Sequence, residues 1–455
     1  ARQGREIADS GTAITLTVSE GDVPYWTGDG DGKWNLASTD NWKLTTAGTY
    51  TTFLVADDVL FDDNAAGAGP VNVDIDSADV APFATTFNNS DRDYVVGSSG
   101  GFGISSGGLT KSGTGTATIT CVNTYAGATT IHEGTLQIGG DGSLGSGNYY
   151  AGIANDGVLQ YSSSAAQTLY GDITGAGSIV KDTGASTLTL RGNNTYTGPT
   201  TVSAGELRIG GAGKLGGGAY AGSISIANGA VFRYNSTSAQ TLSGEISGEG
   251  ELIKSGSTST LTLSGVNTYT GPTTVIAGTL AIGDVSALST TAAISLAGGT
   301  TLRPDVMSAV VNAPITIGDS GTTVTINAPD ATNPSGGTAA VPFTLNGAIS
   351  GAGNVTFSGI QSNNAYGTII LKGASDYEGS TLITCTGSTN TQIFVNLGVD
   401  NALPVTTVLT LDGGNGAGSG RSCVLNLNGH DQTLAGLTNV TRTLRTQIVR
   451  NTSAT

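Results

Sequence analysis

The stretch that decides the fold is TLRGNNTYTGPTTV, residues 189–202, because it recurs in the same chain. A close copy, TLSGVNTYTGPTTV, occupies residues 262–275, and a more distant copy, TITCVNTYAGATTI, occupies residues 118–131. The tyrosines of the three copies are separated by 71 and 73 residues (196 − 125 and 269 − 196). A near-constant spacing of this kind indicates a repeat protein, in which each unit packs mainly on its neighbours.

Short alternations of apolar residues inside the repeats predict β-strands. Leu188 and Leu190 form one such alternation, and Ile224 and Ile226 form another. With a period of two residues, every second side chain points toward the core. The Gly, Asn and Asp residues between the runs are typical of turns. No helical pattern separates the strands, so we expect an all-β solenoid in which each block of about 72 residues forms three coils of about 24.

The order of motifs in the first repeat resembles the autotransporter-associated β-strand repeat found in passenger regions of bacterial surface proteins. Lys111-Ser112-Gly113 comes first, residues 118–131 follow, and Gly134-Thr135-Leu136 ends the motif. The resemblance is good over residues 105–285 and poor over residues 340–440, where a degenerate copy surrounds Tyr377. It implies a right-handed parallel β-helix, a β-solenoid outside the bacterial cell, and it implies no particular ligand.

The N-terminal part differs in composition from the repeats. All three tryptophans, Trp26, Trp34 and Trp42, lie within residues 21–100. We expect this region to form an aromatic-rich β cap over the solenoid end, with carbohydrate stacking by the tryptophans as the alternative. The predicted organisation is an N-terminal arm or strand (1–20), the cap region (21–100), the solenoid repeats (101–440) and a C-terminal strand or tail (441–455). Within the arm, residues 11–19 alternate as a lone strand after a polar segment.

A short acidic loop lies between the first two tryptophans. Asp29, Asp31 and Asn35 resemble an abbreviated calcium-binding loop, although the distant bidentate Glu of such loops is missing. Asp57-Asp58 and Asp62-Asp63 are further candidate ligands for structural calcium. The alternative is a solvated turn whose Asp and Gly residues satisfy the backbone geometry.

Composition and charge restrict the partners and the location. The formal net charge is −16 and charged residues make up 11% of the chain, with no basic stripe that would bind nucleic acid. No apolar run reaches the roughly 18 residues that a membrane-spanning helix needs. The chain begins with Ala1 rather than Met, which predicts either a removed signal peptide or a piece of a longer chain. Together with the resemblance, these features predict an extracellular or cell-surface protein.

The chain has three cysteines, Cys121, Cys385 and Cys423. Cys121 aligns with Gly192 in the second repeat, and Cys385 aligns with Ala277 in the third, so the sibling repeats have small residues there. We expect these cysteines to be small buried side chains, and a disulfide between Cys385 and Cys423 is the alternative.

No catalytic residue and no cofactor-binding residue is predicted. The chain has two histidines, His132 and His430, and no Cys/His cluster with zinc spacing. Residues 103–107 match the Gly-x-Ser-x-Gly pattern, but chance matches are common in a chain with 71 glycines, and no strand-to-helix turn supports this one.

These features favour a self-assembling structural protein of the cell surface. Solenoid ends and terminal strands, residues 12–18 and 443–449, are candidate contacts for an end-to-end homopolymer. If so, deletion of residues 1–19 abolishes assembly and leaves the repeats folded. The second hypothesis is a monomeric adhesin passenger that binds glycans or matrix surfaces. The third is a polysaccharide-degrading enzyme, which needs carboxylates clustered on one face.

Overall fold

The protein is described here from a computed structural model. The structure describes residues 5–9, 14–18, 21–36, 40–184, 186–256, 258–329, 342–359, 366–385, 391–413, 421–440 and 445–452. Side chains are described from residue 21 onward, except those of Arg421 and Arg445. Over these ranges the helical elements are two 3-10 turns, η1 (Gly145–Gly147) and η2 (Gly216–Gly218). Neither of these short turns has the length or hydropathy of a membrane-spanning helix, and the described residues contain no such helix.

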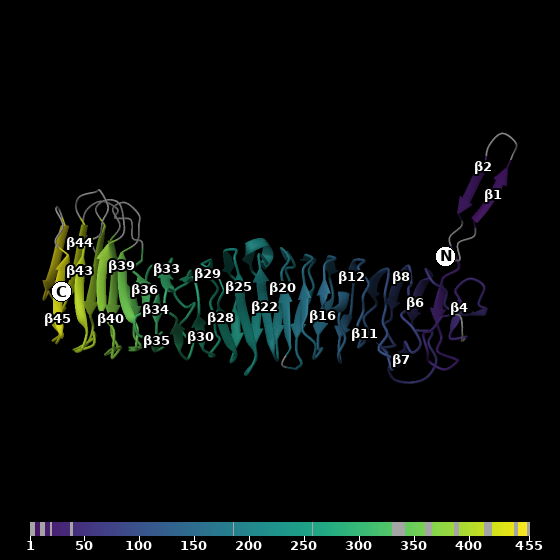
Figure 1. Cartoon of the computed structure of the whole chain (residues 1–455), viewed down its shortest axis with the longest axis horizontal. Coiled ribbons are helices and arrows are strands. Elements are labelled where there is room, and N and C mark those ends of the chain that lie inside the picture. The colour runs from purple at the N-terminus through teal and green to yellow at the C-terminus, as the bar shows by residue number, and fades with distance from the viewer. Residues whose placement is uncertain are drawn as a thin grey trace. The chain divides into compact units, whose positions relative to one another are not determined.

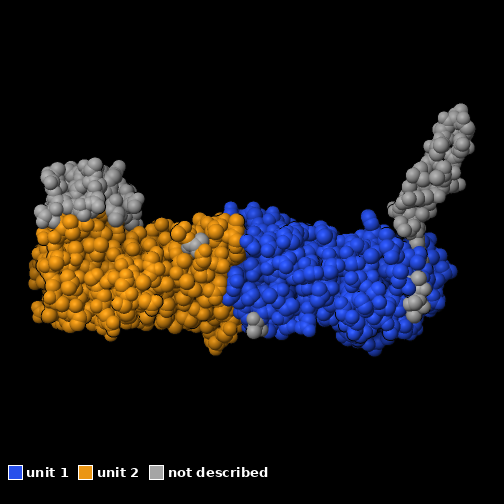
Figure 2. All heavy atoms as spheres, viewed as in Figure 1, with its two compact units in different colours: residues 1–208, 213–217 blue, residues 209–212, 218–455 orange. Residues whose placement is uncertain are grey.

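Two compact units make up the chain, and each is a parallel β-solenoid, as the sequence predicted (Figure 1). Figure 2 colours the first unit, residues 1–208 and 213–217, blue, and the second, residues 209–212 and 218–455, orange. The predicted boundaries at residues 20, 100 and 440 remain a prediction.

Parallel strands of unit 1 stack in three sheets. The first sheet contains β6 (Asp58–Asp62), β8 (Ala84–Asn88), β10 (Gly108–Ser112), β12 (Thr129–Ile131), β15 (Ile153–Asn155) and β18 (Ile173–Thr174). The second contains β7 (Val71–Asp74), β9 (Tyr94–Gly97), β11 (Thr116–Ile119), β13 (Thr135–Ile138), β16 (Val158–Tyr161), β19 (Ser178–Lys181) and β21 (Thr200–Val202). The third contains β14 (Asn148–Tyr149), β17 (Gln167–Leu169) and β20 (Thr187–Leu190).

Unit 2 repeats this construction with parallel strands throughout. One stack contains β23 (Ala219–Tyr220), β26 (Gln240–Leu242), β29 (Thr260–Leu263), β31 (Thr279–Ile282), β33 (Thr301–Pro304), β36 (Thr323–Asn327), β39 (Asn354–Gly359), β41 (Thr381–Cys385), β43 (Val408–Asp412) and β45 (Gly436–Val440). A second contains β25 (Val231–Ser236), β28 (Glu251–Lys254), β30 (Thr273–Val275), β32 (Ile294–Leu296), β35 (Ile315–Ile317) and β38 (Ile349–Gly351). A third contains β34 (Val310–Val311), β37 (Phe343–Leu345), β40 (Tyr366–Leu371), β42 (Gln392–Leu397), β44 (Arg421–Asn426) and β46 (Arg445–Arg450), and β24 (Ile224–Ile226) pairs with β27 (Ile246–Gly248). The strand β22 (Glu206–Gly211) contains residues of both units.

The repeat is not a whole number of coils, which corrects the expectation of three coils of about 24 residues. Thr129 pairs with Ile153, and Ile153 pairs with Ile173, so two successive coils advance by 24 and 20 residues. Thr200, the equivalent of Thr129 in the next repeat, pairs with Ile179 and therefore lies in the second sheet instead of the first. Each repeat is longer than three of these tighter coils, so its successor begins one sheet further round.

Strand burial follows the alternation that predicted the strands. In β20, Leu188 and Leu190 are buried while Thr187 and Thr189 are partly exposed. The inward residues of successive coils are paired in register, so they stack into a continuous core of aliphatic and aromatic side chains.

An aromatic cluster closes the N-terminal end of the unit 1 core, as predicted. The short strands β3 (Pro24–Trp26), β4 (Trp42–Leu44) and β5 (Tyr50–Thr51) pair antiparallel to one another at the edge of the first sheet. Trp26, Trp34 and Trp42 are at most 1% exposed. The ring of Trp34 lies 5.6 Å from that of Phe53 and 5.2 Å from that of Phe61. Because the tryptophans are buried, they do not form a sugar-stacking surface.

The prediction of a lone strand after a polar arm is wrong. The strand β1 (Arg5–Asp9) pairs antiparallel with β2 (Ile14–Val18), which makes a two-stranded hairpin. The first strand has one aliphatic pair in its register, Ile7 opposite Leu16, and its remaining residues are polar or small. Its alternation was therefore too weak to indicate a strand. The other predicted assembly segments, residues 12–13 and 443–444, lie outside the described residues.

Candidate functional site: repeat corners and an exposed tyrosine stack

The repeated asparagine forms a buried corner that joins neighbouring coils. Asn194 is 0% exposed, and its side-chain oxygen accepts a hydrogen bond from the backbone N–H of Ile173 at 3.1 Å. Its amide nitrogen donates to the carbonyls of Gly192 and Lys214 at 2.9 and 3.0 Å. Asn123 makes the same set of contacts, and in the degenerate fourth copy Ser375 keeps one of them through its hydroxyl. The asparagine therefore satisfies backbone groups that turn away from the ladders.

The repeated tyrosine and threonine also form a buried contact. The Tyr196 hydroxyl lies 2.7 Å from the Thr200 hydroxyl, and the pairs led by Tyr125, Tyr269 and Tyr377 lie 3.1, 2.6 and 2.5 Å apart. These rings fill the core while their hydroxyls remain hydrogen-bonded, as a buried tyrosine requires. The asparagine, tyrosine and first threonine of the Asn-Thr-Tyr-x-Gly-x-Thr-Thr motif therefore make buried contacts that stabilise the fold.

A buried lysine binds the turn carbonyls in each of the three clear repeats. The Lys111 ammonium donates to the carbonyls of Ser112 and Gly113 at 2.7 and 2.6 Å. Lys181 donates to the carbonyl of Thr183 at 2.6 Å. The glycine of each Gly-Thr-Leu or Gly-Glu-Leu motif follows these lysine–carbonyl contacts in the chain. Gly134 has a φ of +69°, and a Cβ at this position would lie 2.8 Å from the Lys111 side-chain nitrogen. Both the left-handed conformation and the crowding favour glycine.

These lysines predict a rise in stability between pH 7.5 and 9.5. Burial lowers the pKa of Lys111 and of Lys254 to about 8, and it lowers the pKa of Lys181 as well. The unfolded chain, with lysine pKa values near 10.4, binds more protons in this window, so stability increases with pH. We expect the lysine contribution, measured as the free energy of unfolding of the wild type minus that of the control variant described next, to rise by about 1 kcal/mol or more. Urea unfolding at the two pH values measures this.

The matched control replaces Lys111, Lys181 and Lys254 with methionine, which removes the titration while keeping a long apolar chain. This variant is expected to be less stable and to lose the lysine contribution. Burial raises the pKa of the Cys121 thiol to about 11, so this thiol lowers stability with rising pH, and it does so equally in both proteins. Above pH 10 a buried tyrosine also lowers stability with rising pH, because burial raises the pKa of Tyr269 to about 12 and the unfolded chain loses this proton first. A difference in stability between wild type and variant that falls between pH 7.5 and 9.5 contradicts the assignment.

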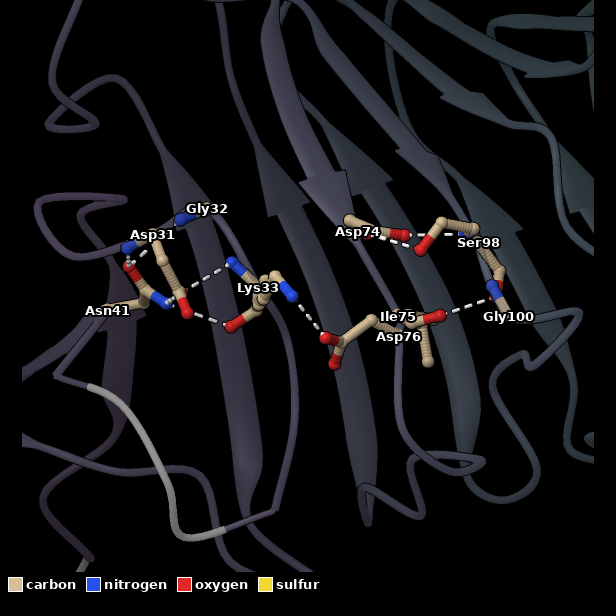
Figure 3. Close-up of polar contacts among 10 residues, drawn as sticks. Asp31, Gly32, Lys33, Asn41, Asp74, Ile75, Asp76, Ser98 and Gly100 are labelled. Atoms are coloured by element: carbon tan, nitrogen blue, oxygen red, sulfur yellow. Dashed lines mark hydrogen bonds and ion pairs between the residues drawn. The ribbon is translucent and has the colours of Figure 1, made fainter.

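The acidic loop of the cap is organised by an asparagine. The side-chain oxygen of Asn41 accepts a hydrogen bond from the backbone N–H of Gly30 at 2.9 Å. It accepts another from the backbone N–H of Asp31 at 3.1 Å (Figure 3). Its amide nitrogen donates to the Asp31 carboxylate at 2.7 Å. Nearby, Lys33 forms an ion pair with Asp76 at 2.5 Å.

Several of the predicted calcium ligands are engaged with protein donors. The Asp29 carboxylate accepts from the Tyr50 hydroxyl at 2.7 Å and lies 3.5 Å from the Lys43 ammonium, and these contacts hold its pKa below the usual value. Asp62 and Asp63 accept from Asn64 and from the backbone N–H of Ser90 respectively. Over the described ranges no group of three or more His, Cys, Asp or Glu side chains could hold a metal ion. Calcium binding stays a prediction without a ligand cage.

The residues weighed for catalysis each have their own local surroundings. The hydroxyl of Ser105 in the Gly-x-Ser-x-Gly match donates to the backbone carbonyl of Val80 at 3.0 Å, within a solenoid coil. His132 is exposed and directly follows β12. His430 lies 3.1 Å from the Asp400 carboxylate at the surface of unit 2.

All three cysteines are buried free thiols, in agreement with the prediction of small buried side chains. Cys385 and Cys423, the pair considered for a disulfide, lie with their sulfurs 3.5 Å apart. Cys121 lies in the other unit, and its sulfur is 3.4 Å from the side-chain oxygen of Asn123.

An exposed stack of side chains was missed at the sequence level. Tyr150, Tyr170 and Arg191 follow three strands paired in register, β14, β17 and β20, so they occupy the same position in successive coils. The two tyrosine rings are stacked with centroids 4.4 Å apart and planes 12° apart, and the Arg191 guanidinium lies 5.0 Å from the Tyr170 ring. Tyr150 is 70% exposed. We call these three residues the tyrosine stack.

The fold does not need the tyrosine stack. In the next repeat, Tyr220, Leu242 and Leu263 are paired in the same register as Tyr149, Leu169 and Leu190. The residues that follow them are Ala221, Ser243 and Ser264, which are small. Sibling coils therefore form with small side chains where unit 1 presents two aromatic rings and a cation. This difference between siblings is the signal that sequence reasoning could have used.

Comparison with known proteins agrees with the repeat geometry. The passenger-associated-transport repeat matches residues 109–138, 182–209 and 252–282, and each match contains one Asn–Tyr–Thr corner. An adhesin autotransporter, BmaC of Brucella suis biovar 1 (strain 1330), is 33% identical over 232 residues. That alignment covers 37% of this chain and 7% of the relative, so the chain spans a small part of the relative's length. No solved structure matches this chain. The chain therefore carries three passenger-associated-transport repeats, which confirms the resemblance to autotransporter passenger proteins that its sequence predicted.

Proposed function

We propose that this chain is a secreted or cell-surface passenger that acts as an adhesin, with its solenoid displaying a surface for glycans or matrix components. The passenger repeats and the adhesin relative support a non-enzymatic surface role. The observation that carries the proposal is the tyrosine stack. The repeated residues are used in corners and core, whereas this stack is exposed and absent from the sibling coils. Aromatic rings with an adjacent arginine are the residue types that dominate binding surfaces.

Replacing the tyrosine stack with the sibling residues tests this proposal. The triple variant Tyr150→Ala, Tyr170→Ser, Arg191→Ser is expected to fold normally, because Ala221, Ser243 and Ser264 occupy these positions in the next repeat. We expect a glycan array or a panel of matrix proteins to bind the wild-type chain, and the variant to bind at least about tenfold more weakly.

The matched control is Phe83→Ala, which removes another exposed aromatic side chain, 71% exposed, from the same unit. This control is expected to bind as the wild type does. Equal binding by the wild type and the triple variant contradicts a role for the tyrosine stack. Failure of the wild type to bind any glycan or matrix protein contradicts the adhesin proposal itself.

End-to-end assembly into a fibre is the second candidate function. The observation that favours it is the outer edge of unit 2, where β45 and β46 are the last strands of their sheets. Leu437 is 54% exposed and Val449 is 44% exposed there. Exposed strand edges with apolar side chains are suited to strand addition by another chain. In the N-terminal cap, β4 and β5 pair antiparallel and do not continue the parallel ladder. Because end-to-end assembly by strand addition would need a matching edge there, the adhesin is the better supported function.

Electron microscopy of the purified chain separates the two functions. Long fibres with a regular axial repeat, lost on deletion of residues 1–19, support assembly. Single particles at all concentrations contradict it and leave the adhesin as the remaining proposal.

A further inference from the structure

Two thiols in unit 2 face each other across the interior. Cys385 is the last residue of β41, and Cys423 lies within β44. Their sulfur atoms are 3.5 Å apart, and both residues are 0% exposed. The chain has three cysteines in 455 residues, so this contact joins two of a very small set.

The two cysteines come from different sheets. The strand β41 pairs with β39 and β43, whereas β44 pairs with β42 and β46. The positions paired with the two cysteines in the preceding coils are Gly359 and Ile393, which shows that neither row is a cysteine ladder. A bond between the sulfurs would therefore fasten one wall of the solenoid to another, and it would close a loop between residues 38 positions apart.

We propose that Cys385 and Cys423 form a disulfide bond in the exported protein. The oxidant is a reactive disulfide of a thiol oxidoreductase or of a small molecule, met before this part of the chain has folded. One cysteine thiolate attacks that disulfide, which gives a mixed disulfide and releases one thiol. The second thiolate then attacks the mixed disulfide and releases the second thiol. Two protein thiols are oxidised, one disulfide is reduced to two thiols, and the protons of the protein thiols pass to the released sulfurs.

Burial explains why this reaction must accompany folding. In the folded chain the thiols are removed from solvent, and the Cys385 and Cys423 sulfurs also lie 3.2 and 3.0 Å from the backbone carbonyls of Ser422 and Asp412. A buried thiol next to another thiol is a poor nucleophile, because the thiolate is the reactive form. Once formed, the disulfide is shielded from reductants by the same burial.

Cys121 provides an internal comparison. It is also buried, but the neighbours of its sulfur are the side chain of Asn123 and the carbonyl of Val96. It belongs to unit 1, whereas the other two cysteines belong to unit 2. The expected product is thus one disulfide and one free thiol per chain.

Thiol labelling of the full chain tests the proposal. The protein is secreted into an oxidising compartment, denatured without reductant in excess iodoacetamide, digested and analysed by mass spectrometry. We expect label on Cys121 alone, with the peptides that contain Cys385 and Cys423 joined and lighter by two hydrogens than their sum. After reduction all three cysteines should take the label. Labelling of all three without reduction overturns the proposal.

Serine variants provide the controls. Cys121→Ser should keep the joined peptide, whereas Cys385→Ser should lose it and expose Cys423 to the label. In a second measurement, reductant under mildly denaturing conditions should speed proteolysis of unit 2 roughly tenfold or more in the wild type. The double variant Cys385→Ser, Cys423→Ser should be cleaved quickly with or without reductant. Cleavage of the wild type that does not respond to reductant contradicts a stabilising role for the bond.

Discussion

Replacing Trp34 with alanine is expected to reduce the free energy of unfolding of the N-terminal cap by about 3–5 kcal/mol. The Trp34 side chain is fully buried and contacts Trp42, Phe53 and Phe61, with ring centroids 5.7, 5.6 and 5.2 Å away. Its removal leaves a large cavity within the aromatic cluster of the cap. The loss is expected to concentrate in the cap because solenoid coils depend mainly on their neighbours.

Tryptophan fluorescence measures this effect locally, since all three tryptophans of the chain lie in the cap. The urea midpoint read by fluorescence should fall strongly, while the midpoint read by far-ultraviolet circular dichroism falls less. Trp34→Phe should cost less, because the Trp34 ring nitrogen is buried without a hydrogen-bond partner and phenylalanine carries no such group. Phe83→Ala, which removes an exposed ring, should change the midpoint little. A Trp34→Ala variant as stable as the wild type would falsify the cap's role.

Replacing Asn194 with alanine is expected to reduce the free energy of unfolding by about 2–4 kcal/mol. The change leaves the N–H of Ile173 and the carbonyls of Gly192 and Lys214 without the partner that Asn194 supplies. Buried backbone groups of this kind carry the full cost of their lost hydration. The effect is local to the corner, so amide hydrogen exchange at Ile173 should speed up more than exchange in strands several coils away.

The neighbouring Asn193 is the matched control, because it has the same side chain in the same turn but is exposed. Asn193→Ala should change stability by no more than about 0.5 kcal/mol. Asn194→Ser should be intermediate, since Ser375 retains one corner contact in the fourth copy with its hydroxyl. Equal effects of Asn193→Ala and Asn194→Ala would show that the corner does not depend on the buried amide.

The repeats made the fold class predictable from sequence. The alternation of Leu188 and Leu190 indicated a strand with one buried face, and both leucines are buried. The clustering of Trp26, Trp34 and Trp42 indicated a cap, and all three rings lie in one cluster. In each case the composition of a single segment was sufficient, because the periodicity of strands and the burial of large rings act locally.

Features that depend on pairing between distant segments were not predictable in this way. The number of residues per coil is set by the pairing of Thr129 with Ile153 and not by the repeat period, so the division into whole coils failed. The strand β1 was missed because its pairing with β2, rather than its own pattern, defines it. The tyrosine stack was missed for the same reason, because Tyr150 and Tyr170 are brought together by the register of their strands.

The advance of one sheet per repeat has a consequence for the direction in which repeated surface sites face. Lys111 and Lys181 are equivalent in sequence, yet they lie in the first and second sheets of unit 1. When a repeat is duplicated, the outward side chains of the copy therefore point to another azimuth about the solenoid axis. When a repeat carries a surface site, the copy of that site in the next repeat therefore lies on a different sheet from the original. Sites duplicated in this architecture therefore face different directions about the axis, whereas a repeat of whole coils aligns its copies along one face.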